Sequence, residues 1–205
     1  GNVHKELSNY QESIRYYKKA LRIQKHILVN NDPRLAMTLN SLGVVYMCLS
    51  NYRLSLKYHE EAKQVRVNCC PETHPDLGET FVNIGETYFS KGYFNAGQTN
   101  IEKGLEIKLK SLNNDHPSLA ITYKNLGQIY DFIGNHDKVL ECYKRSLNIS
   151  LKSTQKDHRD LARTYSNIVE CYNQLDNFAI ALFYHKKALK IRIKSLPACH
   201  SDTIL

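Results

Sequence analysis

HPSLAITYKNLGQIY, residues 116–130, belongs to a set of four related stretches spaced 42 residues apart. The other three are DPRLAMTLNSLGVVY (32–46), HPDLGETFVNIGETY (74–88) and HRDLARTYSNIVECY (158–172). Three columns keep their residue type in every copy: Leu35, Leu77, Leu119 and Leu161; Thr38, Thr80, Thr122 and Thr164; Tyr46, Tyr88, Tyr130 and Tyr172. Self-similarity at a fixed period without insertions predicts stacked repeats rather than one globular core.

Each repeat shows the pattern of two helices. Leu119, Tyr123, Leu126 and Tyr130 recur at steps of three and four, which places them on one helical stripe. Gly127 costs about 1 kcal/mol relative to Ala in mid-helix, a reasonable cost if the backbone of a neighbouring helix must come close there. First helices are predicted near 33–48, 75–90, 117–132 and 159–174. Second helices are predicted near 9–28, 51–70, 93–112, 135–154 and 177–196.

Composition agrees with a helical repeat protein. The 205 residues contain only 9 Gly and 5 Pro, which favours long helices with short connections. No apolar run is long enough for a membrane span, and no amino-terminal signal pattern is visible. Six scattered cysteines without disulfide-framework spacing fit free thiols in a reducing, cytoplasmic compartment.

The Leu-Gly-x-x-Tyr run, as in Leu126-Gly127 and Tyr130, followed by a small residue in the second helix, resembles the tetratricopeptide repeat. The second helix is about two turns longer than in the usual unit of about 34 residues. This length and the HPxLA opening resemble the repeats of kinesin light chains and of nephrocystin-like arrays. The resemblance implies an all-α fold, a right-handed α-solenoid of antiparallel helix pairs. Val169 departs from the pattern, because it replaces the glycine.

The repeat register also predicts the domain organisation. Gly1 aligns with Gly43 in mid-helix, and His200 aligns with His116 at the start of a helix, so we expect a segment of a longer protein. The expected single array comprises a partial repeat at 1–32, repeats at 33–74, 75–116, 117–158 and 159–200, and the start of a further helix at 201–205.

In this family the first helices line a concave groove and the second helices form the convex back. The most regular polar column on the expected groove is Ser41, Asn83, Asn125 and Asn167. An amide both donates and accepts hydrogen bonds, so these asparagines could pair with the backbone of an extended peptide. The alternative interpretation is that they serve helix packing or are family consensus.

Other groove positions vary between repeats, which suits a role in partner choice. Asn40, Glu86 and Gln128 stand at such positions. Lys124 and Arg163 are the candidates to meet a peptide carboxylate, whereas Glu79 and Glu86 suit a basic residue. An ordinary solvated face is the alternative for each of them.

The formal net charge of +8 is unevenly distributed. The first helices sum to −2 and the second helices to +14, with the densest clusters in KKALRIQK (18–25) and KKALKIRIK (186–194). Because a groove that tracks nucleic acid should be basic inside, nucleic acid is an unexpected ligand for the groove. RNA or another anionic surface on the basic convex face remains an alternative, as does a solvated face that keeps the array soluble.

The histidine column His74, His116, His158 and His200 does not predict a metal site, because helices about 8–10 Å apart cannot bring equivalent imidazoles onto one ion. These side chains are expected to cap or pack against the starts of helices. The adjacent Cys69 and Cys70 cannot readily chelate a metal alone. No nucleophile elbow, phosphate-binding glycine loop or carboxylate pair appears, so we expect no enzyme activity, cofactor or metal.

The expected function is therefore a protein–protein interaction scaffold that binds a short extended peptide in its groove, in the manner of a kinesin light chain-like cargo adaptor. Two alternatives stay open: contact with RNA or an anionic surface through the convex face, and a purely structural arm of a larger enzyme or regulatory protein.

Overall fold

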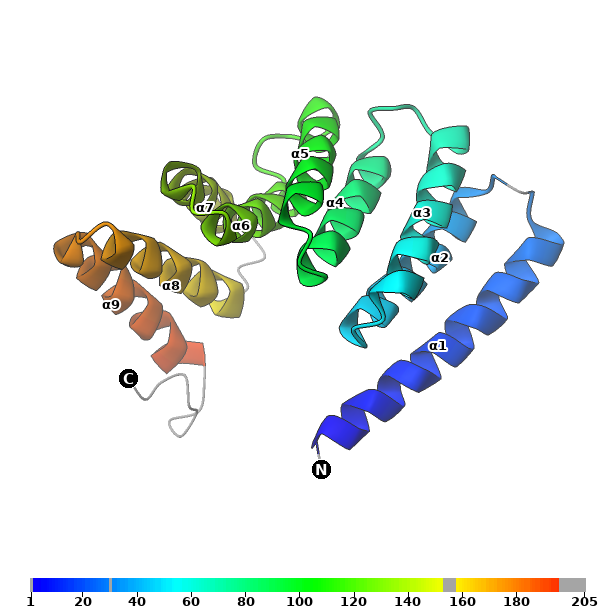
Figure 1. Cartoon of the computed structure of the whole chain (residues 1–205), viewed down its shortest axis with the longest axis horizontal. Helices are drawn as coiled ribbons and strands as arrows, with labels where there is room; N and C mark the ends of the chain where they lie inside the picture. Colours follow the sequence, from blue (N-terminus) through cyan, green and yellow to red (C-terminus); the bar gives the residue numbers. More distant parts are fainter. Residues whose placement is uncertain (1, 30, 153–157, 196–205) are drawn as a thin grey trace. The chain divides into compact units, whose positions relative to one another are not determined.

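The computed structural model describes residues 2–29, 31–152 and 158–195, and this part of the chain folds into nine α-helices without strands (Figure 1). The helices are α1 (Asn2–Ile27), α2 (Pro33–Cys48), α3 (Tyr52–Cys69), α4 (Pro75–Ser90), α5 (Phe94–Ser111), α6 (Pro117–Phe132), α7 (His136–Lys152), α8 (His158–Gln174) and α9 (Phe178–Ser195). The predicted bounds agree to within two residues from α2 to α9. The predicted start of a further helix at 201–205 lies outside the described residues.

Three first helices begin with a side-chain cap followed by proline. Asp32 accepts a hydrogen bond from the backbone N–H of Arg34 at 2.8 Å. His74 and His116 use Nδ1 in the same way, each accepting from the N–H two residues later at 3.2 Å. A capped N–H and a proline at the first position both lower the number of unsatisfied donors. The capping role expected for His74 and His116 is confirmed.

Each first helix ends in the same left-handed turn, whose central residue is Ser50, Gly92, Gly134 or Asp176 with φ between 54° and 89°. In the first turn, the N–H of Ser50 donates to Met47 O at 2.8 Å and that of Asn51 donates to Tyr46 O at 2.9 Å. These two bonds form a Schellman motif, which satisfies carbonyls that the helix end leaves open. The recurrence of this turn reverses the chain at the same point of every repeat.

The mid-helix glycines mark close contacts between the two helices of a repeat. A Cβ on Gly127 would lie 2.7 Å from Cε1 of Tyr143, and a Cβ on Gly43 would overlap the ring of His59. A Cβ on Gly85 in α4 would lie 2.7 Å from the backbone oxygen of Gly97 in α5. The predicted close approach of a neighbouring backbone is found at Gly85, whereas at Gly43 and Gly127 a ring of the neighbouring helix takes the space. Both kinds of contact offset the low helix propensity of glycine.

The helix predicted near 9–28 is present, but it begins earlier than predicted. Gly1 aligns with Gly43 in the middle of a first helix and a second helix is predicted near 9–28, but α1 runs without a break from Asn2. Six or seven residues are too few to form an independent helix that buries an apolar face. Continuing the helix satisfies the backbone hydrogen bonds locally instead.

The chain divides into two compact units, residues 1–112 with α1–α5 and residues 113–205 with α6–α9. Within each unit, consecutive helices pack against one another, and the closest packing joins the two helices of a repeat. In the first unit, a core of Leu21, Leu35, Leu39, Leu42 and Tyr46 lies between α1, α2 and α3. This arrangement confirms the all-α fold of stacked helix pairs.

Candidate functional site

The residues predicted to line a peptide groove fall into two groups. Asn40, Asn83 and Glu86 lie on α2 and α4 in the first unit. The second unit contains the other five: Lys124, Asn125 and Gln128 on α6, and Arg163 and Asn167 on α8. All of them stand on first helices, and each group is described within its own unit.

Asn40 is held by a buried histidine of the neighbouring helix. Its Oδ1 lies 2.8 Å from Nδ1 of His59, whose side chain on α3 is completely buried and rests on Gly43. Burial lowers the pKa of His59 to about 4, so the ring is neutral at pH 7. Because a neutral ring must donate from Nδ1 to reach a carbonyl oxygen, Asn40 is fixed with its amide oxygen toward the core and its NH₂ group turned away.

Asn167 also contacts a buried ring in the second unit, but here its amide NH₂ donates to the phenol oxygen, a bond that opposes the effect of burial on the Tyr143 pKa. The Tyr143 side chain of α7 hydrogen-bonds to Asn167, and only 2% of Tyr143 is exposed. Burial raises the pKa of the Tyr143 hydroxyl well above its usual range, which keeps the phenol protonated. Tyr143 occupies the repeat position of His59 and lies over Gly127 as His59 lies over Gly43. His59 thus contacts an asparagine of its own repeat, whereas Tyr143 reaches Asn167 on the first helix of the following repeat, at a different repeat position.

The remaining polar groove candidates differ in exposure. Asn83 is buried, at 8% exposed, which also suits the helix-packing interpretation. Asn125 is half-buried. Glu86 and Gln128, which share one repeat position, are half-buried as well. The asparagine column is thus not uniformly accessible.

The two candidate cations converge on one carboxylate that the sequence analysis did not single out. Nζ of Lys124 lies 3.5 Å from Oδ1 of Asp160, and Nη1 of Arg163 lies 3.8 Å from the same atom. The Lys124 side chain is 14% exposed, whereas that of Arg163 is 58% exposed. Arg163 is therefore the better placed of the two for a carboxylate of a ligand.

Two further cations are buried in the first unit, and sequence reasoning missed both. Lys108 on α5 is 2% exposed and pairs with Glu79, which is consequently engaged within the fold rather than available to a ligand. Arg66, one repeat earlier, donates to the backbone oxygen of Asp76 at 2.7 Å and to the hydroxyl of Thr80. Arg66 and Lys108 occupy the same position of the 42-residue repeat, and this recurrence is the sequence signal that could have identified them.

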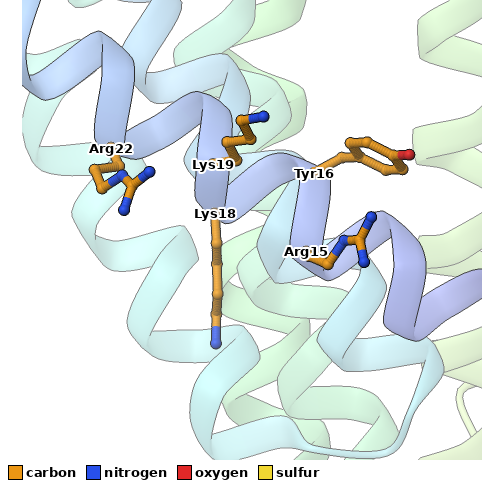
Figure 2. Close-up of a pocket in the computed structure, with 5 residues that line it drawn as sticks. All are labelled: Arg15, Tyr16, Lys18, Lys19 and Arg22. Atoms are coloured by element: carbon orange, nitrogen blue, oxygen red, sulfur yellow. The ribbon is translucent and has the colours of Figure 1, made fainter.

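One of the two basic clusters lies on α1. Figure 2 shows a pocket lined by Arg15, Tyr16, Lys18, Lys19 and Arg22, all from this helix. Lys18 points away from the other cations, and its Nζ lies 5.8 Å from the ring centroid of Tyr46. A hydrogen bond to Tyr46 raises the pKa of Lys18.

Ion pairing distinguishes this surface from the next second helices. On α3, α5 and α7, Lys57, Lys110 and Arg145 each pair with a glutamate four residues away along the same helix. In the described part of the chain, Arg15, Lys19 and Arg22 have no carboxylate within salt-bridge distance. These three cations of α1 are therefore not compensated by a neighbouring carboxylate.

The described residues contain neither a candidate metal site nor a candidate membrane span. Among residues 2–29, 31–152 and 158–195, no group of three or more His, Cys, Asp or Glu side chains could hold a metal ion. Over the same ranges, no helix combines the length and the apolarity that crossing a membrane would require.

Comparison with known proteins agrees with this architecture. A family model of the tetratricopeptide repeat matches residues 1–66 and 76–152, so the chain belongs to the tetratricopeptide repeat family. This fold is that of a protein–protein interaction scaffold. A search of curated proteins found no match.

Several solved structures share the fold at low sequence identity. BtubC (BKLC) from P. vanneervenii matches with a TM-score of 0.81 and 19% identity over 97% of this chain and 80% of that chain. The nearly identical TPR-like repeats of a putative kinesin light chain from Podosopora anserina give 0.72 and 16% over 96% and 93%. MamA gives 0.63 and 24% over 95% of each chain. At these identities the similarity shows the fold alone.

Proposed function

We propose that this chain binds a short, extended peptide segment of a partner protein on the face formed by its first helices. The observation that carries the proposal is the orientation of Asn40, whose amide oxygen lies 2.8 Å from Nδ1 of the buried His59; the contact between Asn167 and Tyr143 supports it in the second unit. An amide that is already oriented loses less side-chain entropy when it binds. It can also pair with a peptide backbone whatever the peptide sequence.

Charge would then select among peptides. In the second unit, Arg163 is exposed and shares Asp160 with Lys124, so an incoming carboxylate can approach the guanidinium directly. Glu86 in the first unit suits a basic side chain. We further propose that the two units are consecutive parts of one array, because the 42-residue register continues across residue 112 without a gap. A role as a cytoplasmic adaptor resembling kinesin light chains fits this proposal and the five free cysteines of the described residues.

Peptide selection followed by titration tests this function. Peptides selected from a random library on the wild-type chain would be titrated against Asn40→Ala and Asn167→Ala. We expect each substitution to weaken peptides bound to its own unit about tenfold, the loss of one hydrogen bond of about 1.4 kcal/mol. Asn148→Ala, an exposed asparagine on α7, is the matched control. Unchanged affinities in both groove variants would reject the proposal, and a failure to select any peptide would favour a structural arm.

The uncompensated cations of α1 support a second candidate function, the docking of an acidic protein segment. Arg15, Lys19 and Arg22 recur at steps of four and three, so they lie along one exposed face over about 10 Å. Carboxylates spaced along an acidic segment could meet them in turn. No such row of unpaired cations occurs in α3 or α5 in the described chain.

A charge-reversal experiment tests this second candidate. Binding of a fluorescent decaglutamate peptide should weaken steeply as salt rises and disappear in Arg15→Glu/Lys19→Glu/Arg22→Glu. Lys138→Glu/Lys144→Glu on α7 is the matched control and should retain binding. Binding of oligouridylate or of phosphatidylserine vesicles in preference to the peptide would contradict an acidic protein partner.

A further inference from the structure

Two adjacent cysteines at the end of α3 form a close thiol pair. Successive side chains of a regular helix point about 100° apart, so adjacent thiols normally diverge. Here α3 ends at Cys69, and Cys70 adopts an extended backbone with φ −123° and ψ 152°. The change of direction brings the two Sγ atoms to 3.3 Å, and both residues stay half-buried rather than sealed in the core.

This pair is poorly suited to the two commonest fates of paired cysteines. Adjacent Cα atoms across a trans peptide are about 3.8 Å apart, shorter than the roughly 4.4–6.8 Å of ordinary disulfides. Burial and the neighbouring Cys69 thiol raise the pKa of Cys70 to about 11, so the thiolate needed for disulfide exchange is scarce at pH 7. Structural zinc requires four ligands, and the described residues offer no third His, Cys, Asp or Glu beside the pair.

A cavity of about 360 Å³ opens beside Cys70. Its apolar wall is formed by Val67, Leu77, Phe81 and Ile107, and Lys103 and Lys110 stand at its edge. Phe81 is half-buried here, whereas Leu39, Tyr123 and Tyr165 at the same repeat position are all buried. The cavity is therefore a departure from the repeat pattern that leaves Phe81 half-buried beside Cys70, with Nζ of Lys103 at 4.7 Å from the ring centroid.

We propose that Cys69 and Cys70 bind a three-coordinate thiophilic centre that carries an apolar substituent, the chemistry of an organic trivalent arsenical. Two arsenic–sulfur bonds would join the thiols, and the third bond keeps the carbon substituent, which enters the cavity against Phe81. No third protein ligand is needed. With phenylarsine oxide the two thiols give up their protons, the arsenic oxygen leaves as one water molecule, and no atom changes its oxidation state.

This site goes beyond the proposed peptide function. Its residues lie at the end of α3, on the connection to α4, on α4 and on α5, and none of them is an asparagine of the proposed peptide face. Loss of arsenical binding would leave the peptide proposal intact, and the reverse also holds. The two can be tested on the same protein preparation.

Intact-mass spectrometry after treatment with phenylarsine oxide tests the thiol chemistry. The wild-type chain should form a one-to-one adduct that releases one water per arsenical, and Cys69→Ser and Cys70→Ser should each lose it. Cys48→Ser, which removes an exposed thiol elsewhere, should keep it. An adduct that persists in Cys69→Ser would overturn the assignment.

A competition experiment tests whether the folded cavity contributes. The peptide QVRVNCCPET, residues 64–73, contains the same thiols without the fold. Burial of the phenyl group should make the folded chain require at least about tenfold more 2,3-dimercaptopropanol than the peptide to release the arsenical. Val67→Trp, which fills the cavity from an exposed position, should remove that advantage and keep the adduct. Equal competitor requirements for wild-type chain and peptide would contradict the site.

Discussion

Residues at equivalent repeat positions have different chemical roles in this protein, and His59 is the clearest case. Ile101 and Tyr143 stand one and two repeats later. All three side chains are almost completely buried over a glycine, but only His59 combines burial with a titratable base. Its Nε2 has no hydrogen-bond partner among the described residues. Protonation would place an uncompensated charge in the core, so the neutral ring is a condition of stability.

The pH dependence of unfolding should report this histidine. Its pKa is about 4 in the folded chain and near 6.5 when unfolded, so between these values the unfolded chain binds more protons. The free energy of unfolding should therefore fall by up to about 3 kcal/mol as the pH drops from 6.5 to 4. Above pH 6.5 the full contribution of the neutral His59 ring is present. Urea unfolding at pH 7 and pH 4.5 measures it. His59→Ile, which adopts the residue of the next repeat, should show a smaller difference, and an equal one would refute the assignment.

Gly127 tests the close contact under Tyr143. Gly127→Ala adds a methyl group 2.7 Å from the Tyr143 ring, closer than van der Waals contact allows. We expect a loss of about 1–3 kcal/mol in the free energy of unfolding, although alanine is the better helix former. Combining it with Tyr143→Ile, the residue found at position 101, should recover part of the loss. A stabilised single variant in thermal unfolding would show that the contact is not close.

At the scale of the helices, sequence periodicity predicted eight of the nine described helices to within two residues because each signal is local. Proline, a capping side chain and a left-handed turn recur at the same offsets. The predicted start failed at α1, because Ser8 and Asn9, which align with the turn residues Ser50 and Asn51, lie within a continuous helix. A turn here would be stable only if the short helix before it could bury an apolar face. That depends on tertiary contacts, which the local sequence does not show.

The left-handed turns allow a reciprocal test. Ser50 has φ 56°, a conformation that costs a residue with a Cβ about 1 kcal/mol, whereas Gly92 fills the corresponding place at φ 89°. Ser50→Gly should therefore stabilise the chain by up to about 1 kcal/mol, and Gly92→Ser should destabilise it by a similar amount. Chemical denaturation of both variants measures this. Changes of the same sign would contradict the shared geometry.

The contact between α3 and α4 includes the buried guanidinium of Arg66. Arg66 is 5% exposed and donates to the backbone oxygen of Asp76 and to Thr80. Thr80→Val should remove one hydrogen-bond acceptor of the Arg66 guanidinium and lower the free energy of unfolding by about 1–3 kcal/mol. Thr99→Val, which changes an exposed threonine on α5, is the control. Equal effects in urea unfolding would mean that the hydroxyl is not needed by Arg66.

At the scale of the whole molecule, the family and the alternation of helix pairs follow from the repeat, whereas the chemistry of the site does not. Which helix face an asparagine occupies was predictable from its register. The ring that holds it was not, because His59 and Tyr143 act through contacts between helices that a single sequence does not display. Asp160, which binds Lys124 and Arg163 together, was missed for the same reason.

A double-mutant cycle on Tyr143 and Asn167 tests the central claim most directly. The affinity of a peptide selected on the second unit would be measured by calorimetry for wild type, Tyr143→Phe, Asn167→Ala and the double variant. If the Tyr143 hydroxyl acts by orienting Asn167, each single change weakens binding about fivefold to tenfold and the double variant is no weaker than Asn167→Ala. Independent, additive losses, or an unchanged affinity in Tyr143→Phe, would contradict it.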